Sequence, residues 1–207
     1  SDDSVYDTVA MRYKYGYGWG ETELIEISNA GSVAFPAIAM DPEGNAIAVW
    51  YQADSGLTSI WANRYANGSG WETAVLIESD DTANAVYPRV AMDAEGNAIA
   101  VWTQSDATRY NIWANRYVKG TGWGTAEPLE TYNFGDALYP QISMDYEGNA
   151  IALWYQSTGS GVTDIVSNRY VNGSGWGTAG VIDSDNAGNA DAPRIAVNAR
   201  GDAIAVW

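Results

Sequence analysis

The feature that most constrains this chain is a short segment that occurs four times. Clear copies run from Ile38 to Trp50, from Val90 to Trp102 and from Ile142 to Trp154, and a more divergent copy runs from Ile195 to Trp207. Each clear copy joins two apolar runs through Asp-x-x-Gly, the pattern of a tight hairpin turn whose glycine is left-handed. The chain is therefore predicted to repeat one β-hairpin.

A second set of markers gives the period of the repeat. Four tryptophans close a Gly-x-Gly-Trp sequence at spacings of 52, 52 and 53 residues: Trp19, Trp71, Trp123 and Trp176. A period near 50 with about four short strands in each unit is typical of a β-propeller blade. We therefore predict an all-β, four-bladed β-propeller with four-stranded antiparallel blades A-B-C-D, about sixteen strands in all, in which residues 1–207 form a single domain.

The order of the predicted strands suggests how the ring closes. The chain begins with strands C-D, continues with three complete A-B-C-D units and ends with A-B. Pairing the amino-terminal C-D strands with the carboxy-terminal A-B strands would complete a fourth blade and leave no inner edge unpaired. This predicts a ring closed within a monomer. The alternative is a dimer in which two chains form an eight-bladed ring.

Two known groups of propellers resemble this sequence. Residues 90–101, Val-Ala-Met-Asp-Ala-Glu-Gly-Asn-Ala-Ile-Ala-Val, are similar to the A-B hairpin of NHL-type propellers, which carry an Asp-x-x-Gly-Asn turn. With the Asn-Arg-Tyr and Gly-x-Gly-Trp markers, the whole chain also resembles the tandem propeller repeats of large bacterial surface proteins. The Asp-box of sialidases matches only in part, because its Ser and Thr-Trp are missing. The resemblance implies a propeller, a fold that hosts many functions.

Composition narrows the classes of partner and chemistry. Ten basic and 26 acidic side chains give a net charge of −16, which disfavours nucleic acid and anionic membrane surfaces. No cysteine or histidine is present, which excludes disulfides, thiolate nucleophiles and Ser-His dyads. The sequence shows no apolar run long enough for a membrane span. We expect an extracellular or cell-surface protein of a bacterium or archaeon.

Polar residues that recur in every copy are expected to serve the blade rather than a ligand. Asp41, Asp93 and Asp145 begin the hairpin turns, where a carboxylate accepts hydrogen bonds from the backbone. The repeated Arg64, Arg116 and Arg169 are expected to pair with carboxylates or to stack on aromatic rings between blades. Function is therefore sought among residues that break the repeat.

The D-to-A and B-to-C connections vary most between repeats and are predicted to share one face of the propeller. Scaffold-mounted variable loops often carry function. The candidate ligand-binding residues are Gln52, Trp61, Gln104, Arg109, Tyr110, Trp113, Tyr132, Asp136 and Gln156. Calcium is the one metal that the loops suggest, through Asp80, Asp81, Asp183 and Asp185, although no calcium-binding motif is present. No other cofactor is expected.

Three functions are consistent with these features. The preferred hypothesis is a non-catalytic, lectin-like module whose partner is a glycan bound on the loop face. The second is a structural or adhesive module that binds a surface protein. The third is a glycoside hydrolase or lyase that uses two carboxylates. We expect no enzymatic activity, because the acids that break the repeat lie in polar loops without apolar surroundings to raise a pKa.

Overall fold

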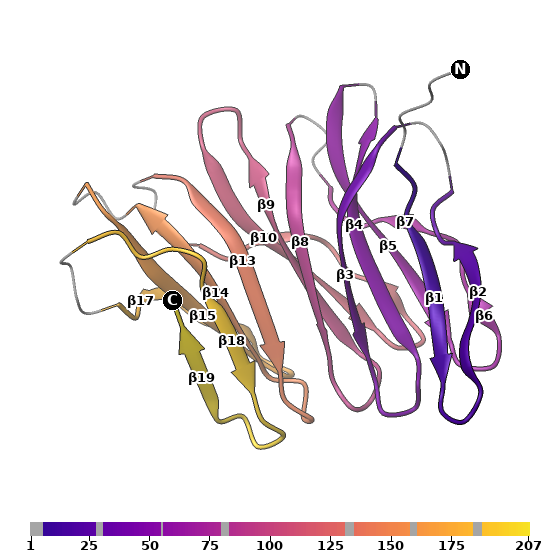
Figure 1. The fold of residues 1–207 in the computed structure, drawn as a ribbon. Helices are drawn as coiled ribbons and strands as arrows, with labels where there is room; N and C mark the ends of the chain where they lie inside the picture. The colour runs from indigo at the N-terminus through magenta and orange to yellow at the C-terminus, as the bar shows by residue number, and fades with distance from the viewer. Residues whose placement is uncertain are drawn as a thin grey trace.

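The computed structural model describes residues 6–27, 31–54, 56–79, 83–130, 135–157, 161–183 and 188–207. Throughout these ranges the regular structure is β-strand, which confirms the predicted all-β class (Figure 1). No helix long and apolar enough to cross a membrane occurs in this part of the chain.

Three antiparallel sheets form complete blades with the predicted A-B-C-D order. The first contains β3 (Val33–Met40), β4 (Ala46–Asp54), β5 (Leu57–Ala66), β6 (Gly70–Trp71) and β7 (Val75–Leu76). The second contains β8 (Ala85–Met92), β9 (Ala98–Ser105), β10 (Tyr110–Val118), β11 (Gly122–Trp123) and β12 (Glu127–Pro128). The third contains β13 (Ala137–Met144), β14 (Ala150–Ser157), β15 (Thr163–Val171), β16 (Gly175–Trp176) and β17 (Gly180–Val181). In each blade the predicted strand D is divided into two short strands that both pair with strand C.

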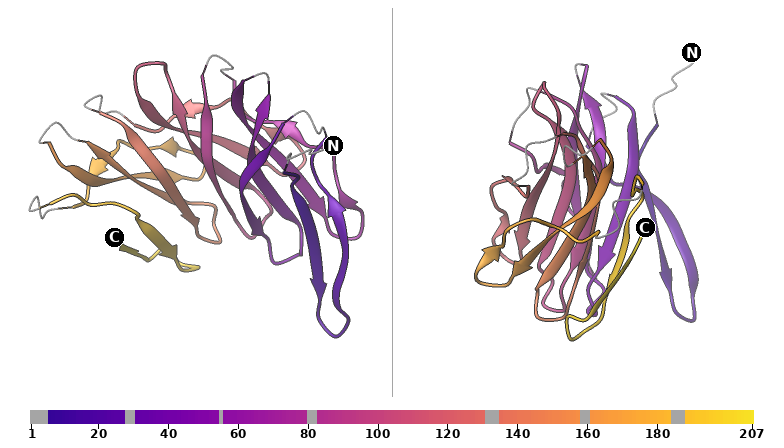
Figure 2. Two further views of the ribbon diagram at one scale, coloured as in Figure 1. Left: turned by 45° about the horizontal axis from the view of Figure 1, so that its top comes forward. Right: turned by 90° about the vertical axis from the view of Figure 1, so that its left-hand side faces the viewer.

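The two remaining hairpins do not close the ring. β1 (Val9–Lys14) pairs with β2 (Gly18–Leu24), and β18 (Arg194–Val197) pairs with β19 (Ala203–Val206), in separate two-stranded sheets. Figures 1 and 2 show these hairpins at opposite ends of a curved row of blades. The predicted pairing within one chain is therefore wrong. The rings of Phe35, Tyr87 and Tyr139, from three successive inner strands, are in contact with one another.

The hydrophobic core lies between neighbouring blades. Trp50, Trp102 and Trp154 are fully buried, and each packs in a cluster with side chains of the preceding blade or hairpin. In each case the indole Nε1–H donates to the glutamine two residues later, as in Trp102 to Gln104 at 2.7 Å. Aromatic residues with a polar tip therefore fill the spaces between blades without leaving the ring nitrogen unpaired.

The repeated polar residues have the predicted structural roles. Asp41 Oδ1 accepts the backbone N–H of Asn45 at 2.8 Å, and the same bond recurs at Asp93 and Asp145. Arg64 pairs with Glu72, and the Arg116 guanidinium lies 5.7 Å from the centre of the Tyr170 ring in the next blade. These residues fix turns and join blades.

The hairpin glycines are left-handed as predicted, and Gly96 also meets the preceding blade. Gly96 has a φ of 88°, and a Cβ there would lie 2.9 Å from Asp41 Oδ2. The carboxylate of Asp41 cannot easily move away, because Asn45 holds both of its oxygens. We expect Gly96→Ala to lower the free energy of unfolding by more than the roughly 1 kcal/mol that alanine costs at an unsuitable φ.

The matched control for this prediction is Gly68→Ala. Gly68 has a similar φ of 91°, but nothing lies within 4 Å of the added Cβ. The difference between the two variants in urea unfolding therefore measures the contact between blades. Equal losses would show that Asp41 and Gly96 do not press against each other.

Candidate functional site

A strained bulge recurs on each inner strand. Phe35, Tyr87 and Tyr139 have positive φ values of 52°, 56° and 52°, and each is followed by proline. The strand register shifts at these positions, so that an additional residue bulges from the pair. Left-handed backbone at a non-glycine residue costs on the order of 1 to 3 kcal/mol and concentrates at functional sites.

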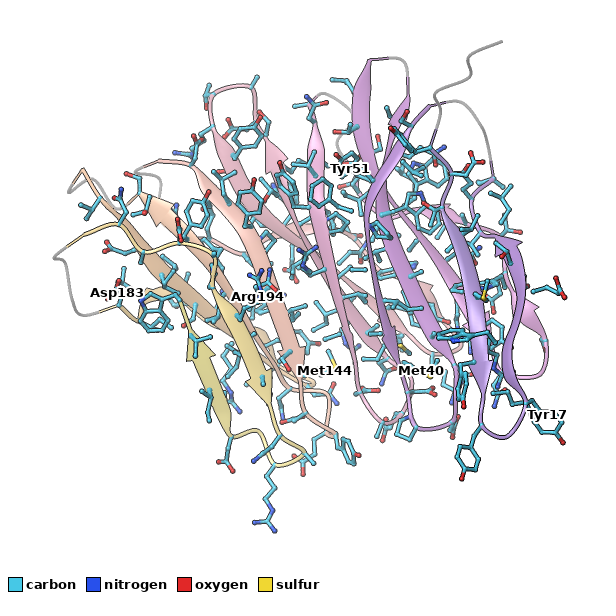
Figure 3. All side chains as sticks on the ribbon, viewed as in Figure 1. Tyr17, Met40, Tyr51, Met144, Asp183 and Arg194 are labelled. Carbon is cyan, nitrogen blue, oxygen red and sulfur yellow. The ribbon has the colours of Figure 1, made fainter. Side chains whose placement is uncertain are left out.

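The bulges bring aromatic side chains of neighbouring blades together. The centre of the Tyr87 ring is 4.9 Å from that of Phe35 and 4.3 Å from that of Tyr139. Tyr51 and Tyr155, from the adjacent B strands, flank this row at 5.7 and 5.8 Å. Tyr51 is labelled in Figure 3. A hydrogen bond with Tyr139 is the main reason that the pKa of Tyr87 is raised to about 12. The hydroxyl of Tyr87 is therefore a neutral donor and acceptor.

The tyrosines of this row, Tyr51, Tyr87, Tyr139 and Tyr155, line a cavity of about 410 Å³ that is formed by the first, second and third blades. Its polar groups include Asn84, whose side-chain oxygen accepts the backbone N–H of Thr58 at 3.0 Å. The lining residues are Tyr51, Thr58, Asn84, Val86, Tyr87, Tyr110, Leu138, Tyr139 and Tyr155. Aromatic walls with a few oriented polar groups are the usual lining of small-molecule sites.

A carboxyl group with an unusual pKa belongs to the same region. Glu130 follows β12, and both of its carboxyl oxygens are shielded from solvent. Burial raises the pKa of Glu130 to about 7, although the nearby Arg109 and Gln156 side chains favour the ionised form. Near neutral pH this carboxyl can therefore hold a proton and release it.

The B-to-C loop of the second blade places a carboxylate and an arginine beside Glu130. Hydrogen bonds from the side chain and backbone of Thr108, with others from Asn111 and the backbone of Arg109, hold the pKa of Asp106 well below its usual range. Arg109 Nε donates to Asn111 Oδ1 at 3.0 Å and lies 3.6 Å from Asp106 Oδ2. Asp106 is thus ionised and orients Arg109.

Asp136 connects the carboxyl cluster to the aromatic cavity. Its Oδ1 accepts the backbone N–H of Tyr110 at 2.8 Å. Its charge also contributes to raising the pKa values of both Glu130 and Tyr155, after the larger effect of burial in each case. Asp136 is itself exposed to solvent. Glu130, whose pKa is raised, and the exposed Asp136 are therefore near enough to interact electrostatically, and Asp136 is bonded to Tyr110, which lines the cavity.

The predicted site residues fall into three groups. Arg109, Tyr110, Asp136 and Gln156 gather around Glu130 or the cavity. Gln52 and Gln104 are buried beneath the loops and accept hydrogen bonds from core tryptophans. Trp61 and Trp113 pack against the hydrophobic clusters between blades, so the structure does not place them beside the cavity. Tyr132 lies outside the described residues.

The predicted calcium ligands are not brought together in the described part of the chain. Asp80, Asp81 and Asp185 lie outside it, and Asp183 is largely buried after β17. Among the residues that the structure describes, no group of three or more acidic side chains has an arrangement suited to a metal ion.

Two features of the site were missed at the level of sequence. The aromatic row has a signal, because an aromatic residue precedes proline in three repeats, at Phe35, Tyr87 and Tyr139. Glu130 also has a signal in the sequence, because the same repeat position is acidic in every copy, as Glu26, Glu78, Glu130 and Asp183. Neither signal was used, because function was sought among residues that break the repeat.

Comparison with known proteins supports the propeller fold. The sequence matches no known family profile and no curated protein. A protein of unknown function from Dyadobacter fermentans superposes with a TM-score of 0.59 at 15% identity, covering 84% of this chain and 57% of that one. The GH93 α-L-arabinofuranosidase of Fusarium graminearum superposes with a TM-score of 0.55 at 14% identity, covering 80% of this chain and 53% of that one. An endo-arabinase from Bacteroides thetaiotaomicron superposes with a TM-score of 0.50 at 15% identity, covering 98% of this chain and 89% of that one.

These matches correct the functional expectation and leave the finer resemblance unconfirmed. The chain spans just over half the length of the Dyadobacter and Fusarium proteins. The prediction of a non-catalytic module without enzymatic activity is contradicted, because the structurally similar proteins of stated activity are glycosidases. At this identity the likeness shows the fold alone. The resemblance to NHL-type repeats is not confirmed.

Proposed function

We propose that this protein cleaves glycosidic bonds. The observation that carries the proposal is Glu130, whose pKa burial raises to about 7, with the exposed Asp136 near it and bonded to Tyr110 of the aromatic cavity. Most glycosidases use two carboxyl groups, one that donates a proton to the departing oxygen and one that acts as base or nucleophile. Pairs of acids with divergent environments are the usual way to divide these roles.

Each part of the site has a role in this proposal. Glu130 donates the proton to the glycosidic oxygen, and Asp136 acts on the anomeric carbon directly or through a water molecule. Asp106 keeps Arg109 oriented beside Glu130. The positive charge of Arg109 favours the ionised carboxylate that Glu130 becomes after it has given up its proton. The tyrosines of the cavity offer ring surface and neutral hydroxyl groups to a sugar. The similar arabinofuranosidase and endo-arabinase support a glycan as the substrate.

The test is release of reducing sugar from a panel of glycans that includes linear arabinan. We expect Glu130→Gln and Asp136→Asn each to lower kcat by about 100-fold or more, because general acid–base catalysis contributes on that scale. The control is Glu95→Gln, which makes the same chemical change at an exposed hairpin turn. Wild-type protein that cleaves no member of the panel, or a fully active Glu130→Gln variant, would contradict the proposal.

Three further expectations belong to this proposal. The protein acts outside the cell or on its surface. Two chains are expected to form an eight-bladed ring. Such a ring would cover Ile204 and Val206, which are 75% and 59% exposed at the free edge of β19. The mass of the protein in solution tests this expectation. Calcium binding by the D-to-A loops is tested by whether a chelator lowers the melting temperature.

A further inference from the structure

Two arginines on the inner strands are near enough to affect each other electrostatically, and neither forms an ion pair with a residue that the structure describes. Arg89 on β8 and Arg194 on β18 occupy the same repeat position, directly after the proline of the bulge. The strand between them, β13, contacts both β8 and β18 and carries Gln141 at this position. Figure 3 labels Arg194 beside β13. Three side chains rich in N–H donors therefore come from three adjacent strands.

The local hydrogen bonds orient these side chains and leave donors unused. Arg89 Nη1 donates to the carbonyl of Pro88 at 2.8 Å, and Arg194 Nη1 donates to that of Pro193 at 2.8 Å. Gln141 Nε2 makes the equivalent bond to Pro140 at 2.9 Å. A guanidinium has five N–H donors, so most of those on each arginine remain for another acceptor.

The arrangement is electrostatically unfavourable without a ligand. Burial, together with the positive charge of Arg194, lowers the pKa of Arg89. Within the described ranges Arg64, Arg109 and Lys119 form ion pairs, and Arg89 and Arg194 are among the seven basic side chains that do not. The whole chain carries 26 acidic side chains and only ten basic ones. Two like charges on nearby strands, with no ion pair to an acid among the described residues, indicate an anionic ligand.

The position of the pair points to the kind of anion. Arg89 is two residues beyond Tyr87, so it adjoins the aromatic row that lines the cavity, and Gln141 is likewise two residues beyond Tyr139. We propose that Arg89 and Arg194 bind the carboxylate of an acidic sugar whose ring lies against this row. The choice of a sugar as the bearer of the carboxylate rests on the proposed function, whereas the anion site rests on the two arginines alone.

Direct binding to pairs of matched glycans tests the assignment. The probes are oligosaccharides that contain a uronic or sialic acid, each compared with its carboxyl-reduced form and with a sulfated neutral sugar. Binding is measured by calorimetry with wild-type protein and with Glu130→Gln, so that cleavage does not interfere. A failure of hydrolysis then leaves this test intact.

The variants are Arg89→Gln, Arg194→Gln and the control Arg200→Gln. The first two introduce the residue that the third blade already carries as Gln141, and the control removes a charge from an exposed turn. We expect at least one acidic probe to bind tenfold or more tightly than its reduced form. Each of the first two variants should lose that preference, and Arg200→Gln should keep it.

Stability provides a second readout that separates binding from a structural role. Removing one of two repelling charges should leave the melting temperature of Arg89→Gln unchanged or raise it, while binding weakens. A large fall in melting temperature would assign Arg89 a structural role and overturn the proposal. So would equal binding of acidic and reduced probes. A preference for the sulfated sugar over every carboxylate would overturn the assignment to an acidic sugar.

Discussion

Replacing Trp102 with alanine is expected to lower the free energy of unfolding by about 3 to 5 kcal/mol, the usual range for removing a large buried aromatic side chain. Trp102 is fully buried, and it packs in the cluster that joins the first and second blades. Its loss also removes the hydrogen bond that occupies the buried side-chain oxygen of Gln104. Urea unfolding followed by circular dichroism measures the change. Circular dichroism is used instead of fluorescence because the substitution removes one of the tryptophans that produce the fluorescence signal.

The repeat provides a matched control at the end of the chain. Trp207 occupies the same repeat position but is 52% exposed, because no strand C pairs with β19. We expect Trp207→Ala to change the free energy of unfolding by about 1 kcal/mol or less, as is usual for surface substitutions. An equally large loss at Trp207 would show that this end of the row is covered in solution. A small loss at Trp102 would contradict the packing between blades.

The sequence was sufficient to predict the blade but not the ring. The Asp-x-x-Gly turns and the Gly-x-Gly-Trp markers determine local hydrogen bonding, and the structure places strands on both sides of them. Closure depends on the angle between neighbouring blades. That angle depends on packing between blades, which includes contacts such as that of Phe35 with Tyr87. Their left-handed backbone is invisible in the sequence, because most residues before proline adopt extended conformations.

The candidate site shows the same division between local and long-range information. Arg109, Tyr110 and Asp136 were predicted because they lie in loops that differ between repeats. Glu130 was not, since its pKa depends on burial and on Gln156, which belongs to the next blade. A search restricted to the acids that break the repeat therefore misses Glu130. An acid at a repeated position acquires its environment from residues 20 or more positions away in the chain.

Ionisation of Glu130 should make the protein less stable as the pH rises from 5 to 8. The folded pKa of about 7 lies above the ordinary value of 4.5, so the folded state binds the proton more tightly than the unfolded state. Stability from this group is therefore complete below pH 4.5 and is lost as the pH passes through 7. We expect a loss on the order of 1 to 2 kcal/mol, because solvent still screens a carboxyl that is only partly enclosed.

Glu130→Gln identifies the group responsible, since glutamine keeps the shape of the side chain but cannot ionise. The variant should lose this pH dependence in urea unfolding, whereas Glu95→Gln, at an exposed turn, should retain it. Asp106 does not confuse the result, because its lowered pKa confines its effect to more acidic conditions. The same proton governs the proposed reaction, so wild-type kcat should decline as the pH rises above 7. The carboxyl of Glu26, whose pKa burial also raises, contributes in the same direction and is unaffected by this variant. A pH dependence as large as that of the wild type in Glu130→Gln would therefore show that Glu130 is not the group responsible, and it would remove the proton donor from the proposed site.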